Sequence, residues 1–243
     1  MKRAILSWSG GLDSTCLLLH LLAEGYMVKT YSFKYGQKHS IELQKVKENF
    51  KLFQSKGFLV THQVIDLTDC FDTSVSSLSS HGAEIPKGDY KDENMKSTVV
   101  ENRNVIFASI LYGKALSWAK LDRGPVTIFL GLHSGDHTIY PDCTEESRLA
   151  CEHAFKVSNW DSDLIDYQAP FNHLDKAGVL EKGSESMWKL GLTPGESIGV
   201  LKNTHTCYSP DAEGRSCGEC GSCRERLEAF EKNQLKDPIE YVR

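Results

Sequence analysis

Ser9-Gly10-Gly11-Leu12-Asp13-Ser14-Thr15 is the stretch of this sequence that decides the fold. It follows a short apolar run over residues 4–8 and leads into a second one over residues 14–24, which predicts a turn from a strand into a helix. Adjacent glycines let the main chain turn sharply and approach an anion without a Cβ in the way. The helix N-terminus adds unpaired N–H groups and a positive dipole. These features predict a loop that binds pyrophosphate.

Two other interpretations of this stretch are weaker. A Walker loop would end in Gly-Lys-Ser or Gly-Lys-Thr and use its lysine to hold the β- and γ-phosphates, but this stretch has no lysine. A plain glycine-rich turn with an Asp or Ser cap would also explain Gly10 and Gly11. The full pattern at the junction of a strand and a helix favours phosphate binding over the plain turn.

Apolar periodicity in the rest of the chain predicts an α/β fold with a doubly wound parallel sheet. Strands are expected over residues 4–8, 27–33, 57–65, 126–131 and 165–169. Helices are expected over residues 14–24, 40–55, 102–119, 145–158 and 174–190, the last interrupted by Gly178 and Gly183. Helix 14–24 is apolar on nearly every side, so it should be buried. The loops at 9–14, 34–40, 66–104 and 132–143 are expected to meet above one crevice, beyond the carboxyl ends of the strands.

The composition favours small-molecule chemistry. Lys and Arg number 28 against 33 Asp and Glu, so a net charge of −5 provides no overall basic field for a nucleic acid. No apolar run is long enough to span a membrane and the first residues lack the apolar core of a signal peptide, so we expect a cytoplasmic protein. We expect a nucleotide-binding α/β domain over residues 1–201 and a small tail over 202–243 that ends in a helix.

Four of the eight cysteines crowd into the tail, at Cys207, Cys217, Cys220 and Cys223. Two C-x2-C steps that share a cysteine, with a fourth thiolate upstream, can close a tetrahedral shell of four sulfurs. Zinc is the expected ion, and a four-iron cluster is the alternative. A zinc ion held by four thiolates would pin the tail and take no part in the chemistry. The remaining thiols are expected to be plain buried or half-exposed ones, namely Cys16, Cys70, Cys143 and Cys151.

Polar residues in the loops after the strands are candidates for the site. Tyr35, Gln37 and His39 follow the second strand, where they could lie near the nucleotide or in a solvated loop. Arg103 could grip a phosphate or carboxylate with its fork of donors, although a single arginine in the first turn of a helix is more often a surface charge.

The loop over residues 131–143 carries more polar chemistry than a turn requires. Its His133 and His137 would suit a metal on a helix, but glycine and proline in the same loop argue against a helix. Hydrogen-bonding roles are therefore expected for the loop.

These motifs together resemble the 7-cyano-7-deazaguanine synthase family, the queuosine-pathway branch of the PP-loop ATP pyrophosphatases. The matches cover nearly the whole chain: SGGLDST at 9–15, Tyr35, Gln37, His39, Thr98-Val99-Val100, Asn102-Arg103-Asn104, Gly131, Tyr140-Pro141-Asp142-Cys143, Lys176-Ala177-Gly178, Thr206-Cys207-Tyr208 and the last three cysteines of the tail. The ordered set is far more specific than any single motif.

The resemblance implies an adenine nucleotide alpha hydrolase-like fold and an ATP-dependent carbon–nitrogen ligase. The family converts 7-carboxy-7-deazaguanine and ammonia into 7-cyano-7-deazaguanine through an adenylated carboxylate and an amide, and it consumes two ATP. ATP, Mg²⁺ and Zn²⁺ are the implied cofactors, and a homodimer is the implied assembly.

The resemblance also implies residue roles. Asp13 would help to hold Mg²⁺, and Arg103 and Lys176 would stabilise charge on the transferred groups, which makes these three the expected catalytic residues. The residues expected to bind the nucleotide are Ser9, Gly10, Gly11, Leu12, Asp13, Ser14, Thr15, Tyr35, Gln37 and His39. The residues expected to bind the deazaguanine are Arg103, Asp136, Tyr140 and Asp142, because a carboxylate can accept from an amino group and a ring N–H together.

One departure from the family pattern leaves the product open. Thr144 stands where the family usually carries arginine, which removes a positive charge beside the base pocket. A related ligase that stops at the 7-amide, or that joins the activated deazaguanine to a protein amine, is therefore the alternative. Two further alternatives are weaker. A tRNA-modifying thiolase of the same superfamily would need a basic face, which the net charge of −5 disfavours. A zinc-ribbon adaptor with a degenerate nucleotide site would not be expected to keep an intact SGGLDST.

Overall fold

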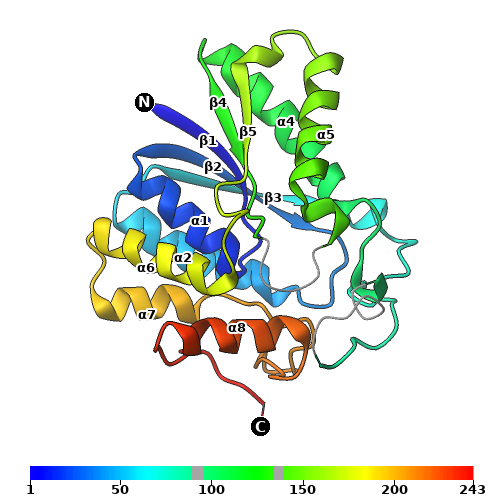
Figure 1. Ribbon diagram of the computed structural model, residues 1–243, viewed down its shortest axis with the longest axis vertical. Coiled ribbons are helices and arrows are strands. Elements are labelled where there is room, and N and C mark those ends of the chain that lie inside the picture. The colour runs from blue at the N-terminus through cyan, green and yellow to red at the C-terminus, as the bar shows by residue number, and fades with distance from the viewer. Residues whose placement is uncertain (89–95, 134–139, 243) are drawn as a thin grey trace.

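The core of the protein is a five-stranded sheet in which every pair of neighbouring strands is parallel (Figure 1). The computed structural model describes residues 1–88, 96–133 and 140–242. The strands are β1 (Lys2–Ser7), β2 (Tyr26–Lys34), β3 (Val60–Asp66), β4 (Val126–Phe129) and β5 (Ile165–Gln168), in the spatial order β3-β2-β1-β4-β5. The strand order reverses at β1, so the crevice of the sheet lies where β1 and β4 diverge.

Helices cover both faces of the sheet, which confirms the doubly wound fold (Figure 1). On one face, α1 (Leu12–Ala23) and α2 (Ile41–Ser55) pack against the sheet, α6 (Lys176–Lys189) packs against α1, and α8 (Gly221–Lys232) packs against α6. Helix α7 (Pro194–Lys202) contributes to the same hydrophobic core. The other face packs against α4 (Arg103–Leu121) and α5 (Glu145–Ser158). Short 3-10 turns lie at Thr68–Cys70, Pro141–Cys143 and Ser162–Leu164. Side chains that alternate along β1 divide between the two cores, with Leu6 in the first and Ile5 in the second.

Helix α1 is buried on nearly every side, as its composition predicts, because α6 packs against it as well as the sheet. The predicted interruption of α6 at its glycines is wrong, since the helix runs unbroken through both. Gly178 lies in the first turn, where its N–H donates to the Asp175 cap at 2.8 Å. Gly183 lies against α1, where a Cβ would overlap the Sγ of Cys16. Gly183 therefore permits a close contact between α6 and α1 and does not break α6.

Helix α7 was not expected from the sequence, although its start carries clear signals. Pro194 occupies its first turn, and Thr193 forms a capping box with Glu196. Within the described residues, no helix combines the length and the apolar character needed to cross a membrane.

The tail is joined to the rest of the protein through Arg226 of α8, whose side chain is fully buried. Its guanidinium donates to Asp237 at 2.8 and 3.0 Å, to the hydroxyl of Thr204 at 2.8 Å and to the carbonyl of Leu201 at 3.2 Å. A buried charge that is paired and fully hydrogen-bonded holds its neighbours in one arrangement. The division of the chain at residue 202 stays a prediction.

Candidate functional site

A cavity of about 320 Å³ opens at the carboxyl edge of the sheet, beside the point where β1 and β4 diverge. Its walls come from segments far apart in the sequence: the loop after β1, the end of β2, the first turns of α2 and α4, and the segment that leads into α5. Ser9, Tyr35, Glu42, Arg103 and Asp142 contribute its polar lining. Open parallel sheets bind their ligands at this place.

The loop after β1 is shaped to receive an anion. Gly10 has φ +92°, and a Cβ there would overlap the backbone oxygen of Glu42, so α2 approaches the loop as closely as glycine allows. Gly11 is the N-cap of α1 and provides no side-chain cap for the first turn. The hydroxyls of Ser9 and Ser14 lie 3.1 Å apart and both residues line the cavity. Uncapped N–H groups and two hydroxyls make a phosphate-binding surface.

Asp13, in the first turn of α1, belongs to a buried ionic cluster. Its Oδ2 lies 2.9 Å from Nζ of Lys176 and 3.6 Å from Nε2 of His133, and Lys176 also pairs with Glu225 at 3.2 Å. Burial opposes the charge on Asp13, but Lys176 and His133 outweigh it and hold the pKa of the carboxyl well below its usual range. Burial likewise opposes the charge on Lys176, and its two carboxylates raise its pKa. Asp13 is therefore an anion with Oδ1 left without a partner among the described residues.

Arg103 points into the cavity from the first turn of α4 and is not the surface charge that its position favours statistically. Its Nη1 donates to the hydroxyl of Tyr35 at 3.1 Å, and its Nε donates to Oδ1 of Asn104 at 3.2 Å. Asn104 in turn donates to Oδ2 of Asp142 at 2.8 Å. Tyr35, Arg103, Asn104 and Asp142 thus form one hydrogen-bonded chain along the wall of the cavity.

The loop after β2 is ordered by its own side chains. Gln37 accepts from the N–H of Tyr35 at 2.8 Å and donates to the carbonyl of Phe33 and to Oε1 of Glu42, both at 3.1 Å. His39 is buried, and burial together with the Arg103 charge lowers its pKa to about 3. Gln37 is committed to shaping this loop, and nucleotide contacts by Gln37 and His39 stay predictions.

The second half of the predicted base pocket is described in part. Asp136 and His137 lie outside the described residues. The hydroxyl of Tyr140 lies 2.7 Å from that of Thr98, and burial raises its pKa, so the phenol is neutral. Thr144 is the N-cap of α5, where its hydroxyl accepts from the N–H of Ser147 at 3.1 Å.

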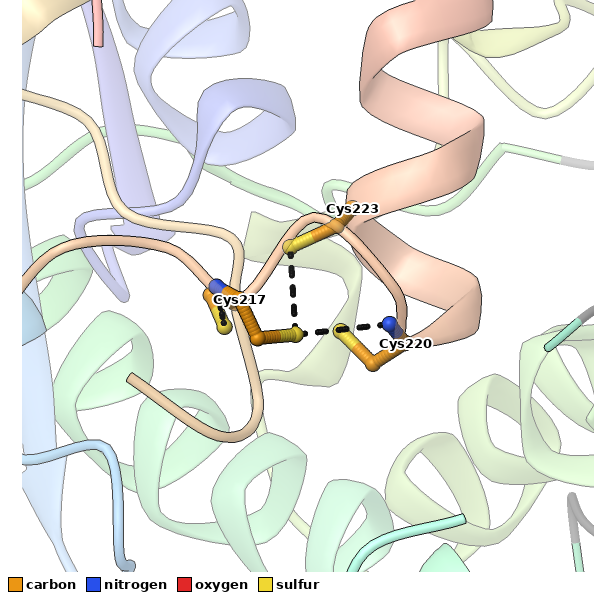
Figure 2. Close-up of side chains that lie close together, drawn as sticks. Cys217, Cys220 and Cys223 are labelled. Carbon is orange, nitrogen blue, oxygen red and sulfur yellow. Dashed lines mark hydrogen bonds between the residues drawn. The ribbon is translucent and has the colours of Figure 1, made fainter. Parts of the chain in front are cut away.

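The four tail cysteines converge, with one sulfur from each lying within 4.8 Å of the others. Figure 2 shows the sulfurs of Cys217, Cys220 and Cys223 facing one another. The N–H groups of Ser209 and Cys217 donate to the sulfur of Cys207 at 3.3 and 3.2 Å, as expected for a sulfur that carries negative charge. A metal ion with tetrahedral thiolate bonds of about 2.3 Å would fit this spacing. The cluster could therefore hold a metal ion.

The cysteine cluster and the anion-binding loop are adjacent through the segment that joins them. The N–H of His205 donates to the carbonyl of Gly10 at 2.9 Å, two residues before Cys207. Helix α8, which begins at the cluster, carries Glu225 to Lys176. The tail thus contacts the loop by two routes.

A doubly wound parallel sheet with an SGGLDST loop at its switch point defines a nucleotide-binding protein of the PP-loop type. The chain matches the family described as "Queuosine biosynthesis protein QueC" over residues 3–234. It is 38% identical to the 7-cyano-7-deazaguanine synthase of Caldicellulosiruptor saccharolyticus, over 98% of this chain and 95% of the relative. The synthases of Hahella chejuensis and a Marinomonas species are also 38% identical, over 99% of this chain and 93% and 98% of the relatives.

The chain therefore belongs to the QueC family of queuosine biosynthesis proteins, which confirms the resemblance drawn from the motifs. Sequence reasoning missed Glu42 and Glu225, and it quoted Asn104 in a matched motif without assigning it a role; these residues line the cavity or support its charges. A signal for the first was present, because Glu42, Val46, Asn49 and Phe53 share the helical spacing of one face. A carboxylate on that otherwise buried face marks a special position.

Proposed function

We propose that this protein makes 7-cyano-7-deazaguanine from 7-carboxy-7-deazaguanine, ammonia and ATP. The observation that carries the proposal is the shared cavity, which is lined both by the anion-binding loop and by the Arg103–Asp142 chain. Membership of the QueC family, whose relatives bear the synthase name, supports this substrate over other carboxylates.

The chemistry requires activation before amination. A carboxylate is a poor acyl donor, so its oxygen first attacks the α-phosphorus of ATP and pyrophosphate leaves. Ammonia then attacks the acyl carbon and displaces AMP, which gives the amide. In a second round the amide oxygen is adenylated and pyrophosphate leaves, and loss of AMP and of both protons of the amide nitrogen yields the nitrile.

The loop residues have the character that this reaction needs. Ser9, Ser14 and the N-terminus of α1 would stabilise the leaving pyrophosphate. Asp13 is ionised with one oxygen unpartnered among the described residues, which suits a Mg²⁺ ion at the phosphates. Lys176 keeps that carboxylate charged and in place.

Substrate recognition would use the part of the cavity that the Arg103–Asp142 chain lines. Arg103 would bind the carboxylate or the transferred phosphate, and Tyr140, Asp142 and Asp136 would read the polar edge of the base. Thr144 leaves no charge of its own there, but Arg148 lines the cavity from one turn further along α5. Its guanidinium already donates to Glu145, Glu152 and the carbonyl of Tyr167, so the product has to be determined by experiment.

The accompanying parts of the proposal follow from the family and the cysteine geometry. The cluster of Cys207, Cys217, Cys220 and Cys223 would hold Zn²⁺, which supplies a structural cross-link and no Lewis-acid chemistry. The protein would act as a homodimer in the cytoplasm.

Mass spectrometry of the products, with pyrophosphate release followed in parallel, tests the proposal. Purified protein with ATP, Mg²⁺, 7-carboxy-7-deazaguanine and ammonium should yield the nitrile and two pyrophosphates per turnover. Pyrophosphate release that ends at the amide, or a deazaguanine mass on a protein, would select the alternative ligases. Absence of pyrophosphate release would contradict both.

A further inference from the structure

Glu42 is a buried carboxylate in the wall of the cavity that the reaction described above does not use. It lies in the first turn of α2, with about 10% of its side chain exposed. Its backbone oxygen approaches Gly10, so the first turn of α2 packs against the loop where the adenylate would form. Ser9 of that loop lines the same cavity.

The neighbours of Glu42 leave part of its carboxylate without a hydrogen-bonding partner. Among the described residues, Gln37 donates to Oε1 at 3.1 Å and Nε2 of His39 lies 3.8 Å from the same oxygen. Within the described residues, the hydrogen bond and the ion pair of this carboxylate both go to Oε1, which leaves Oε2 open. This oxygen is available to a molecule in the cavity.

The polar and charged groups around Glu42 come from the segment between β2 and α2 and from α4. The segment provides the phenol of Tyr35, the amide of Gln37 and the imidazole of His39, which burial keeps neutral. Helix α4 provides the Arg103 guanidinium. Burial raises the pKa of Glu42 to about 7, while Gln37 and Arg103 act in the opposite direction. A carboxyl group with this pKa can exchange a proton at neutral pH.

Amide formation from ammonium would use such a group. At neutral pH most ammonia is present as ammonium, which has no lone pair to attack an acyl carbon. A group that binds this cation and removes one proton from it beside the adenylate would supply the nucleophile where it reacts.

We propose that Glu42 is the ammonium-binding residue and the proton acceptor of the amination step, a role that rests on the proposed function. Ammonium transfers one proton to the Glu42 carboxylate, which gives ammonia and a neutral carboxylic acid. The nitrogen lone pair forms the C–N bond, the C–O bond to AMP breaks, and AMP leaves as an anion. The surplus proton on the new amide nitrogen passes to water, and Glu42 releases its own proton to solvent before the next turnover.

The decisive experiment separates activation from amination in the Glu42→Gln variant. ATP–pyrophosphate exchange with 7-carboxy-7-deazaguanine reports activation and needs no ammonia, so it should stay within about threefold of the unmodified protein. Amide formation from ammonium should fall by about 10²–10⁴-fold. Hydroxylamine, which is largely uncharged at neutral pH, should form its hydroxamate with a loss of less than about tenfold.

Glu48→Gln is the matched control, because Glu48 lies on the same helix and pairs with Lys45 at the surface. It should leave exchange and amination unchanged. If Glu42→Gln does not fold, judged by thermal unfolding, Glu42→Asp serves instead, and its shorter carboxylate should slow amination about tenfold while exchange persists.

Three results would overturn the role of Glu42. They are unchanged amination in Glu42→Gln, exchange lost as fully as amination, and hydroxylamine slowed as much as ammonium. Absence of exchange in the unmodified protein would instead overturn the proposed function and this role with it.

Discussion

The anion-binding loop and the cysteine cluster use the same backbone device for different purposes. Each contains a glycine with positive φ, +92° at Gly10 and +74° at Gly218, and each gathers main-chain N–H groups around one point. In the cluster these groups already donate to the sulfurs of the chain itself. In the loop, the first turn of α1 has no side-chain cap. Main-chain N–H groups that donate to atoms of the chain itself stabilise the fold, whereas main-chain N–H groups without such an acceptor can bind a ligand.

The two regions also differ in what supports them. The loop is held from outside, by Lys176 at Asp13 and by the N–H of His205 at Gly10. The cluster is held by its own thiols, and a metal ion would join them. A substitution that disrupts the cluster should therefore also disturb the loop, through the tail, whereas a substitution in the loop should leave the cluster intact.

Loss of the metal is expected to have the largest effect. Cys217→Ser removes one ligand from the cluster, and the resulting loss of metal should lower the melting temperature by about 10 °C or more, since structural zinc contributes strongly to folding. Thermal unfolding and metal content measured together check this. Cys70→Ser, at an exposed thiol, should change neither quantity. A metal-free Cys217→Ser protein that melts like the unmodified one would contradict the structural role.

Lys176→Met should have the next largest effect, because it leaves Asp13 and Glu225 without their shared cation in a buried site. We expect the free energy of unfolding to fall by about 3–5 kcal/mol. Urea unfolding measures the loss. Lys182→Met is the control, since that lysine pairs with Glu185 at the surface of the same helix and should cost about 0–1 kcal/mol. Equal losses in the two variants would show that the buried ion pairs of Lys176 contribute no more to the free energy of unfolding than a surface ion pair does.

Gly10→Ala and Gly218→Ala form a matched pair that sharpens the comparison. Both place a side chain at positive φ, but only the Cβ at Gly10 overlaps backbone, that of Glu42. Gly10→Ala should cost about 2–4 kcal/mol, and Gly218→Ala about 1 kcal/mol. The first should also raise the KM for ATP, and the second should not. The reverse order of stabilities, measured by urea unfolding, would contradict the close approach of α2 to the loop.

The smallest expected effect is a pH dependence from His39, whose pKa is lowered to about 3 in the folded protein by burial and by Arg103. The unfolded chain takes up a proton near pH 6.5 and the folded chain does not, so stability is present above pH 6.5 and is lost as the pH falls toward 3. Between pH 7.5 and 5.5 His39 should account for about 1 kcal/mol of the loss, in addition to the contributions of His62 and His205, whose pKa values burial lowers to about 4. His39→Gln should reduce the loss by about 1 kcal/mol, and His153→Gln, at an exposed histidine, should leave it unchanged.

The fold could be predicted from the sequence because its signals are local. Apolar runs marked each strand to within a few residues, and SGGLDST marked the strand-to-helix turn. The predicted break at Gly183 was wrong, because the sequence alone does not distinguish a glycine that permits a close contact, here with Cys16, from one that ends a helix. Helix α7 was missed although Thr193, Pro194 and Glu196 carry its start signals.

The candidate site was harder to predict because its partners meet across long separations. The motif residues Asp13 and Lys176 were both singled out, but their ion pair joins positions 163 residues apart. Local statistics placed Arg103 at the surface, and only the packing of β2 and α4 turns it toward Tyr35. The roles of Glu42 and Glu225 depend on burial, which single residue types do not reveal.

The central position of β1 has a consequence for the order of folding. Ala4 pairs with Val28 of β2 on one side and with Thr127 of β4 on the other. During synthesis β1 can therefore pair with β2 soon after both are made, but it can pair with β4 only after more than a hundred further residues. Until β4 arrives, the unpaired edge of an apolar strand is exposed. Conditions that delay the second half of the chain should therefore make this protein prone to aggregation during synthesis, however stable the finished sheet becomes.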